Sequence, residues 1–327
     1  MSPDKPDPGK IGYTKIKTKE SEEVLSKVLR EHEIFQSQRD KRKQLLRRLS
    51  EHDKTQKVGV VAFLCSESAN ASIGPEDIPG LGDALSSIGD VDQLDFILDG
   101  PGGDGPVAEK IIELCRSYCK KFRVIVPNRA KSAATIIALG ADQIVMGHTS
   151  ELGPIDAQVM VVTSGLPRYI SAQSFIDARE SLESRFKEAA KKREETKHIL
   201  QQIASLDPSF IDHCEKLMGF STAVAKKNLC KYMFKSLPNA EQNKRIAAVL
   251  KALASVSEFK VHGRMINANT AKTELKLDVH LLPKDDPHWK LIWHYYIRVN
   301  VAMSGSSIGK LIETKNELLM MRAFASS

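Results

Sequence analysis

The sequence predicts an α/β protein with a mainly parallel sheet flanked by helices, together with a helical N-terminal extension and a helical insertion. Two observations predict this fold. Between residues 57 and 146, short apolar runs typical of strands buried on both faces alternate with segments that suit helices. Two turns rich in small residues connect such strands to the helices that follow. Strands alternating with helices imply right-handed crossovers and therefore parallel strands.

The chain is predicted to begin with a flexible polar tail, residues 1 to about 17, and a charged helix from Glu20 to about Lys54. The apolar stripe of this helix is incomplete, which favours packing on the main body or on a second subunit, with a frayed solvent helix as the alternative. Between Arg39 and Arg48 the helix is rich in Lys and Arg. We interpret this stretch as a solvated face and expect no nucleic-acid partner, because no aromatic platform or zinc-finger spacing accompanies it.

The core elements follow in a regular order. Strands are predicted over 57–64, 94–98, 122–127 and 143–146, with helices over 75–89, 107–120 and 132–140 and a loop over 153–156. From Ser171 to about Ser257 the pattern is nearly all helical, with breaks at Asp207-Pro208, Gly219 and Leu237-Pro238. Val261 to Pro283 is expected to return to the core, and a last helix from Trp289 to about Met303 to bury both tryptophans.

These elements give four parts of the chain: a tail and charged helix (1–56), an α/β core (57–170), a helical region (171–257) and a closing core segment with a C-terminal helix (258–327). The composition is that of a globular protein, with 42% hydrophobic and 27% charged residues. We expect no signal peptide and no membrane span, since no apolar stretch approaches about 18 residues. The five cysteines lack CxxC pairing, which favours free thiols and a cytoplasmic location.

The most informative feature is a pair of strand-to-helix turns, Asp99-Gly100-Pro101-Gly102-Gly103 and Arg129-Ala130-Lys131-Ser132-Ala133-Ala134. Acyl transfer needs a hydroxyl nucleophile and backbone N–H groups that hold an oxyanion. Gly102 and Gly103 leave room for a substrate carbonyl, and Ala133 offers a second N–H beside Ser132. The simpler interpretations are a plain turn for the glycines and a helix N-cap for the serine.

These motifs resemble the Clp protease/crotonase superfamily, and most closely the serine dehydrogenase proteinase family, relatives of signal peptide peptidase A. The resemblance also rests on Ala138-Leu139-Gly140-Ala141-Asp142, Ile144-Val145-Met146-Gly147, Leu152-Gly153-Pro154-Ile155-Asp156 and, more weakly, on 262–264 and 277–279. It implies a Clp/crotonase-like catalytic core over 57–170. It also implies that Ser132 is the nucleophile and that Gly102, Gly103 and Ala133 line the oxyanion hole.

The residue that activates the serine is left open. In Clp-type peptidases it is a histidine on the loop after the next strand, where this chain has Asp156, 24 residues beyond Ser132. We hypothesise a swapped triad with His262 as general base oriented by Asp156; the alternative is that both are structural. The serine–lysine dyad of signal peptide peptidase A is a second option, with Lys187 or Lys191 as the base, although exposed lysines are the simpler interpretation.

Two more basic side chains lie near these motifs in the sequence. Lys131 precedes the serine and is expected to point away from it, towards solvent. His148 is another possible base, with a loop histidine as the simpler interpretation. The other histidines show no ligand-like spacing, so we expect no metal and no cofactor.

The leading interpretation is a soluble, ATP-independent serine endopeptidase that acts on peptide or protein substrates and forms homo-oligomers. A catalytically silent scaffold that binds peptides through the same groove is the main alternative, because the expected histidine near Asp156 is missing. An acyl-CoA enzyme of the same fold is a weaker alternative, since the acid/base carboxylates of that class have no counterpart pair here.

Overall fold

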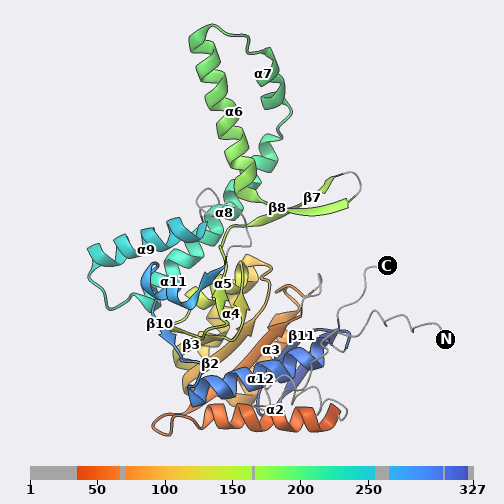
Figure 1. Ribbon diagram of the computed structural model, residues 1–327, viewed down its shortest axis with the longest axis vertical. Helices are drawn as coiled ribbons and strands as arrows, with labels where there is room; N and C mark the ends of the chain where they lie inside the picture. The colour runs from red at the N-terminus through yellow and green to blue at the C-terminus, as the bar shows by residue number, and fades with distance from the viewer. Residues whose placement is uncertain (1–34, 67–70, 164–165, 255–264, 305, 323–327) are drawn as a thin grey trace, which may run out of the picture. The chain divides into compact units, whose positions relative to one another are not determined.

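The computed structural model describes residues 35–66, 71–163, 166–254, 265–304 and 306–322 (Figure 1). The chain folds as two compact units. The first comprises Met1–Leu152 with Ile266–Ser327, and the second comprises Gly153–Met265.

In the described part of the first unit, seven strands form one sheet in the order β10-β5-β3-β2-β1-β11-β12. The five strands from β10 to β1 are mutually parallel, as predicted. They are β1 (Val58–Cys65), β2 (Val91–Asp99), β3 (Cys119–Val126), β5 (Gln143–Met146) and β10 (Val279–Leu281). Two antiparallel strands that were not predicted, β11 (Ile308–Glu313) and β12 (Leu318–Arg322), complete the sheet next to β1.

Helices cover both faces of this sheet. The chain steps from β1 to β2, β3 and β5 in one direction, so right-handed crossovers place their connecting helices on one face. These are α3 (Asp77–Ile88), α4 (Gly105–Ser117) and α5 (Ala133–Leu139). The other face is covered by α2 (Phe35–Ser50) and α12 (Pro287–Ser304), which lie side by side (Figure 1). The predicted N-terminal helix therefore packs on the main body over its described part.

The hydrophobic core follows from the period-two alternation of the strands. Val58, Val60, Ala62 and Leu64 of β1 belong to the same buried cluster as apolar residues of α2 and α12. Phe63 belongs to the other face, where it packs through Phe96 of β2 towards Phe122 of β3. One expectation needs correction: Trp289 is buried, whereas Trp293 is only partly buried and lies at the margin of the cluster.

A small second sheet stands beside the main one in the first unit. It has the order β4-β6-β9, with β4 (Arg129–Ala130) parallel to β6 (Glu151–Leu152) and β9 (Ile266–Asn267) antiparallel to β6. Helix α11 (Ala268–Thr273) leads from it to β10, so the described part of the segment 261–283 returns to the core as predicted. Strand β4 ends two residues before Ser132 and fixes the backbone that leads to it.

The second unit is largely helical, as predicted, but opens with an unpredicted hairpin. Its elements are β7 (Gln158–Thr163), β8 (Leu166–Ser171), α6 (Ala172–Lys192), α7 (Lys197–Ala204), α8 (Pro208–Asn228), the π-helical turn η1 (Leu229–Met233) and α9 (Asn239–Ala254). Asp207 caps α8 by accepting from the Ser209 amide at 2.8 Å, which explains the predicted break there. The break predicted at Gly219 is wrong, because α8 continues through it.

No helix among the described residues has both the length and the apolar character that crossing a lipid bilayer would require.

Candidate active site

The two turns singled out by the sequence meet at one edge of the sheet. Because β2 and β3 are parallel neighbours, the turns that follow them leave the sheet on the same side. Backbone hydrogen bonds join the turns: the Gly100 amide donates to the Arg129 carbonyl at 3.0 Å, and the Lys131 amide donates to the Gly100 carbonyl at 3.2 Å. The Asp99 carboxylate accepts from the Arg129 amide at 2.8 Å. Segments some thirty residues apart are therefore held in fixed register.

Gly102 lies directly against Ser132. A Cβ atom on Gly102 would come within 2.7 Å of both the Lys131 carbonyl oxygen and the Ser132 Cβ. Gly102 also has φ of +108°, a conformation that side-chain-bearing residues rarely adopt. Both the close approach and the backbone angle therefore require glycine at this position.

Gly103 is held by a third segment, the one that carries Ile73. The Ile73 amide donates to the Gly102 carbonyl at 2.7 Å, and the Asp104 amide donates to the Ile73 carbonyl at 2.9 Å. Gly103 has φ of +144°, and a Cβ there would overlap the Ile73 backbone. Asp104 then caps α4 by accepting from the Val107 amide. The glycine turn is thus fixed on both sides.

Ser132 is held in a strained backbone conformation immediately before α5. Its φ of +49° and ψ of −118° are unusual for a residue with a side chain. The simpler interpretation of this serine as an N-cap fails, because its side chain makes no capping hydrogen bond. The residue is partly exposed, and within the described chain its hydroxyl has no hydrogen-bond partner. A strained serine whose hydroxyl caps nothing is the arrangement expected of a presented nucleophile.

The predicted oxyanion donors stand on either side of this serine. Ala133 is the first residue of α5, where a backbone N–H has no partner within the helix. Gly103 is exposed, and neither its amide nor that of Ala133 donates to any described residue. Their role in holding an oxyanion remains a prediction, to which this arrangement lends support.

A buried ion pair supports the segment that holds Gly103, and no local sequence pattern predicts it. The Lys310 ammonium lies 2.9 Å from Asp77 and 2.5 Å from Glu76, while Asp77 also accepts from the Gly74 amide at 2.8 Å. Burial acts to lower the pKa of Lys310, but the hydrogen bonds to Glu76 and Asp77 outweigh it and raise that pKa. Burial raises the pKa of Asp77 despite these partners.

The candidate bases are placed as follows. Asp156 is fully buried in the second unit. His262 lies outside the described residues. Lys187 and Lys191 are exposed on α6, as the simpler interpretation expected, and so lack the burial that a lysine base needs.

Two further basic residues of the first unit, Lys131 and the possible base His148, contact other groups. Lys131 was expected to point towards solvent. Instead it is only partly exposed, and its ammonium pairs with Glu151 at 2.7 Å. His148 lies beside two aromatic rings of α12, with its ring centroid 6.1 Å from that of Trp289 and 6.4 Å from that of Trp293.

Residues 28–181 match the family model of the ClpP-like SDH-type serine proteinases. The match includes both turns and confirms the resemblance to the Clp/crotonase superfamily of serine peptidases.

Two uncharacterized proteins of Methanocaldococcus jannaschii are related to shorter segments. MJ0137 is 41% identical over 66 residues, which are 20% of this chain and 23% of the relative. MJ1495 is 33% identical over 85 residues, which are 26% of this chain and 24% of the relative. The similarity therefore spans about a quarter of each curated relative. The ClpP protease catalytic domain from Plasmodium falciparum is 12% identical, with a TM-score of 0.31 over 66% of this chain and 84% of that one.

Proposed function

We propose that this chain, whose residues 28–181 match the ClpP-like SDH-type serine proteinases, is a serine endopeptidase that hydrolyses peptide bonds without ATP. The observation that carries the proposal is the contact of Gly102 with Ser132, which places a glycine turn against a strained serine whose hydroxyl caps nothing. In this arrangement, a substrate carbonyl bound against the glycine turn would lie within reach of the Ser132 hydroxyl.

The reaction would proceed through an acyl-enzyme. The Ser132 oxygen bonds to the peptide carbonyl carbon while its proton passes to a general base. The oxyanion that forms would accept hydrogen bonds from the Gly103 and Ala133 amides, each worth about 3 kcal/mol in the transition state. Collapse of this intermediate breaks the C–N bond, and the amine leaves with the proton from the base. Water then hydrolyses the ester and restores the hydroxyl.

For the base we propose His262, oriented by Asp156. Support for Asp156 comes from its burial, which is typical of the acid that orients a catalytic histidine. Lys187 and Lys191 remain the alternatives, and their exposure on α6 weighs against them. We further propose that the enzyme is cytoplasmic and acts as a homo-oligomer.

A fluorophosphonate probe, which labels activated serine hydroxyls, tests the proposal on the full chain. Labelling should occur in the natural protein, disappear in Ser132→Ala and persist in Ser117→Ala, whose exposed hydroxyl donates to the Leu114 carbonyl. Labelling that survives Ser132→Ala would overturn the assignment. Among variants that remain folded, His262→Ala but not Lys187→Ala should abolish labelling, and casein hydrolysis should be the same with and without ATP.

One observation favours a second candidate, a catalytically silent scaffold that binds peptides. Within the described residues the Ser132 hydroxyl makes no hydrogen bond, so no described group stands ready to accept its proton. If the natural protein is folded, is not labelled and still binds unfolded peptides, the scaffold is the correct function.

A further inference from the structure

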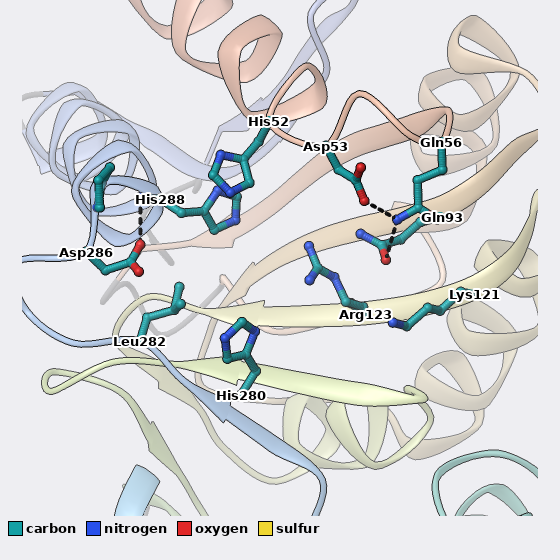
Figure 2. A pocket seen from close by; sticks show the side chains of 11 residues that line it. His52, Asp53, Gln56, Gln93, Lys121, Arg123, His280, Leu282, Asp286 and His288 are labelled. Carbon is teal, nitrogen blue, oxygen red and sulfur yellow. Dashed lines mark hydrogen bonds between the residues drawn. The ribbon is translucent and has the colours of Figure 1, made fainter.

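A buried lysine, Lys310, lies at the same edge of the sheet as the glycine turn. On β11 it pairs in register with Cys65, the last residue of β1, and a Cβ on Gly100 of the turn would lie 3.3 Å from the Cys65 sulfur. The Lys310 side chain is only 4% exposed. Lys121, by contrast, is the third residue of β3 and lines a cavity towards the amino ends of the parallel strands (Figure 2). Lys310 is therefore a buried cation on the Ser132 side of the sheet.

The ammonium of Lys310 holds the carboxylate of Asp77, the first residue of α3. It lies 2.9 Å from one oxygen of this fully buried carboxylate, and it also pairs with the more exposed Glu76. Asp77 in turn accepts from the Gly74 amide at 2.8 Å, and its own amide donates to the Gly74 carbonyl at 3.0 Å. Lys310 thus fixes the carboxylate that fixes Gly74.

The residue before Gly74 is Ile73, whose backbone pairs with the glycine turn as a parallel bridge to Gly103. The bridge uses the Gly102 carbonyl, at 2.7 Å, and the Asp104 amide, at 2.9 Å. In parallel pairing these two groups face the partner segment, while the N–H of the residue between them points to the opposite side. The bridge therefore directs the Gly103 amide away from Ile73, as an oxyanion donor requires.

Stability alone gives little reason for this buried cation. Taking two charges out of water carries a large desolvation cost, so apolar residues of similar volume often stabilise a protein as well as a buried ion pair does. What the pair supplies is a defined geometry, because Asp77 must face both the Lys310 ammonium and the Gly74 amide. The position of the segment that contacts the glycine turn depends on this geometry.

We propose that Lys310 is a positioning residue for the oxyanion, a role that rests on the proposed peptidase function. Through Asp77 and the Ile73 segment, it holds the Gly103 amide where the oxyanion forms. Loss of Lys310 should lower kcat and leave KM nearly unchanged, since this amide stabilises the transition state rather than the bound peptide.

Lys310→Met tests the proposal on the full chain, with Arg42→Met as its matched control. Each variant removes a buried cation from a carboxylate, and Arg42 pairs with Glu313 of the same strand, outside the Ile73 segment. Hydrolysis of a fluorogenic casein peptide is measured at a temperature at which circular dichroism shows both variants folded. In Lys310→Met, kcat should fall about tenfold or more while KM stays within about threefold. In Arg42→Met, both constants should stay within about threefold of the natural values.

Amide hydrogen exchange gives a readout that does not depend on activity. The Ile73 and Asp104 amides should exchange about tenfold or more faster in Lys310→Met than in Arg42→Met. Equal exchange in the two variants, or an equal fall in kcat, would overturn the proposal. If the natural protein shows no Ser132-dependent labelling, the proposed function fails, whereas the exchange rates still decide whether Lys310 holds the turn.

Asp77→Asn puts the same question if Lys310→Met does not fold. Asparagine has the shape of aspartate, and Lys310 keeps Glu76 as its counter-ion, so no buried charge is left alone. The asparagine oxygen is a weaker acceptor for the Gly74 amide than a carboxylate is. The kcat should fall several-fold and the Ile73 amide should exchange faster. Unchanged kcat and exchange in this variant would overturn the proposal.

Discussion

Arg42 and Glu313, 271 positions apart in the chain, form a buried ion pair that joins the first described helix to the antiparallel edge of the sheet. The Arg42 Nε lies 2.9 Å from Glu313 Oε2, and the two side chains are 1% and 2% exposed. The same carboxylate accepts from the Tyr295 hydroxyl at 2.8 Å. Burial raises the pKa of Tyr295 well above its usual range, so its hydroxyl stays protonated as a donor. One carboxylate thus connects α2, α12 and β11.

Removing one partner of this pair should be strongly destabilising. Arg42→Met leaves the Glu313 carboxylate buried without its cation, a change that typically costs about 3 to 5 kcal/mol. Urea unfolding followed by circular dichroism measures the loss. Arg42→Met combined with Glu313→Gln should recover part of it, because the uncompensated charge is then absent. A loss below about 1 kcal/mol in the single variant would show that the pair contributes little.

Gly102→Ala should impair both stability and labelling. The new methyl would stand within 2.7 Å of the Lys131 oxygen and the Ser132 Cβ, at a φ that alanine rarely adopts. We expect a loss of about 2 kcal/mol or more in unfolding free energy. Fluorophosphonate labelling should fall as well, since the turn must move away from the serine.

Gly82→Ala is the matched control for that substitution. Gly82 lies inside α3, and a Cβ there would meet nothing within 4 Å. Alanine should therefore stabilise the helix by up to about 1 kcal/mol and leave labelling unchanged. If both glycine variants behaved alike, the contact between Gly102 and Ser132 would not explain the requirement for glycine.

The fold was predictable where neighbouring residues alone decide it. The strands β1, β2, β3 and β5 are apolar runs bounded by turns. The conformation of the two turns at the candidate site is determined by their own glycines and small residues. Strand β11 was not predictable, because it buries Lys310 and Glu313, whose partners Asp77 and Arg42 lie far away in the sequence. From the local sequence pattern alone, such charged residues are predicted to lie on the surface.

The candidate site, too, could be predicted from the sequence only in part. Ser132 and its glycine turn follow from local motifs, and their contact follows from the parallel order of β2 and β3. The identity of the general base does not follow from local motifs, because it depends on which distant segment reaches the Ser132 hydroxyl. The helix break predicted at Gly219 is wrong for a related reason: packing of buried neighbours such as Met218 outweighs the low helix propensity of one glycine.

His288 should make stability depend on pH. Burial, and to a lesser extent the nearby His52, lowers the pKa of His288 to about 4 from 6.5. The unfolded chain therefore binds more protons between these values, so stability is full above pH 6.5 and falls as the pH drops toward 4. The loss attributable to this residue is on the order of 3 kcal/mol.

Unfolding free energies measured across this pH range test the prediction. His288→Leu should flatten the dependence, whereas His280→Gln, at an exposed position, should leave it unchanged. Besides His52, the charged groups facing His288 are Asp95, Arg123 and Asp286, and all three persist in both variants. An unchanged slope in His288→Leu would contradict the assignment.

Ser132→Gly should remove the reactive hydroxyl and raise the melting temperature of the protein. The φ and ψ of Ser132, +49° and −118°, match the first central position of a type II′ turn, which glycine adopts without strain. Such strain costs about 1 to 3 kcal/mol in a residue with a side chain. Ser132→Ala keeps the Cβ and therefore the strain, so it is the control that separates loss of the hydroxyl from relief of the backbone. Both variants should lose labelling, but Ser132→Gly alone should unfold at a higher temperature than the natural protein. Equal melting temperatures for the two variants would contradict this prediction, because they would show that the backbone conformation of Ser132 is not strained.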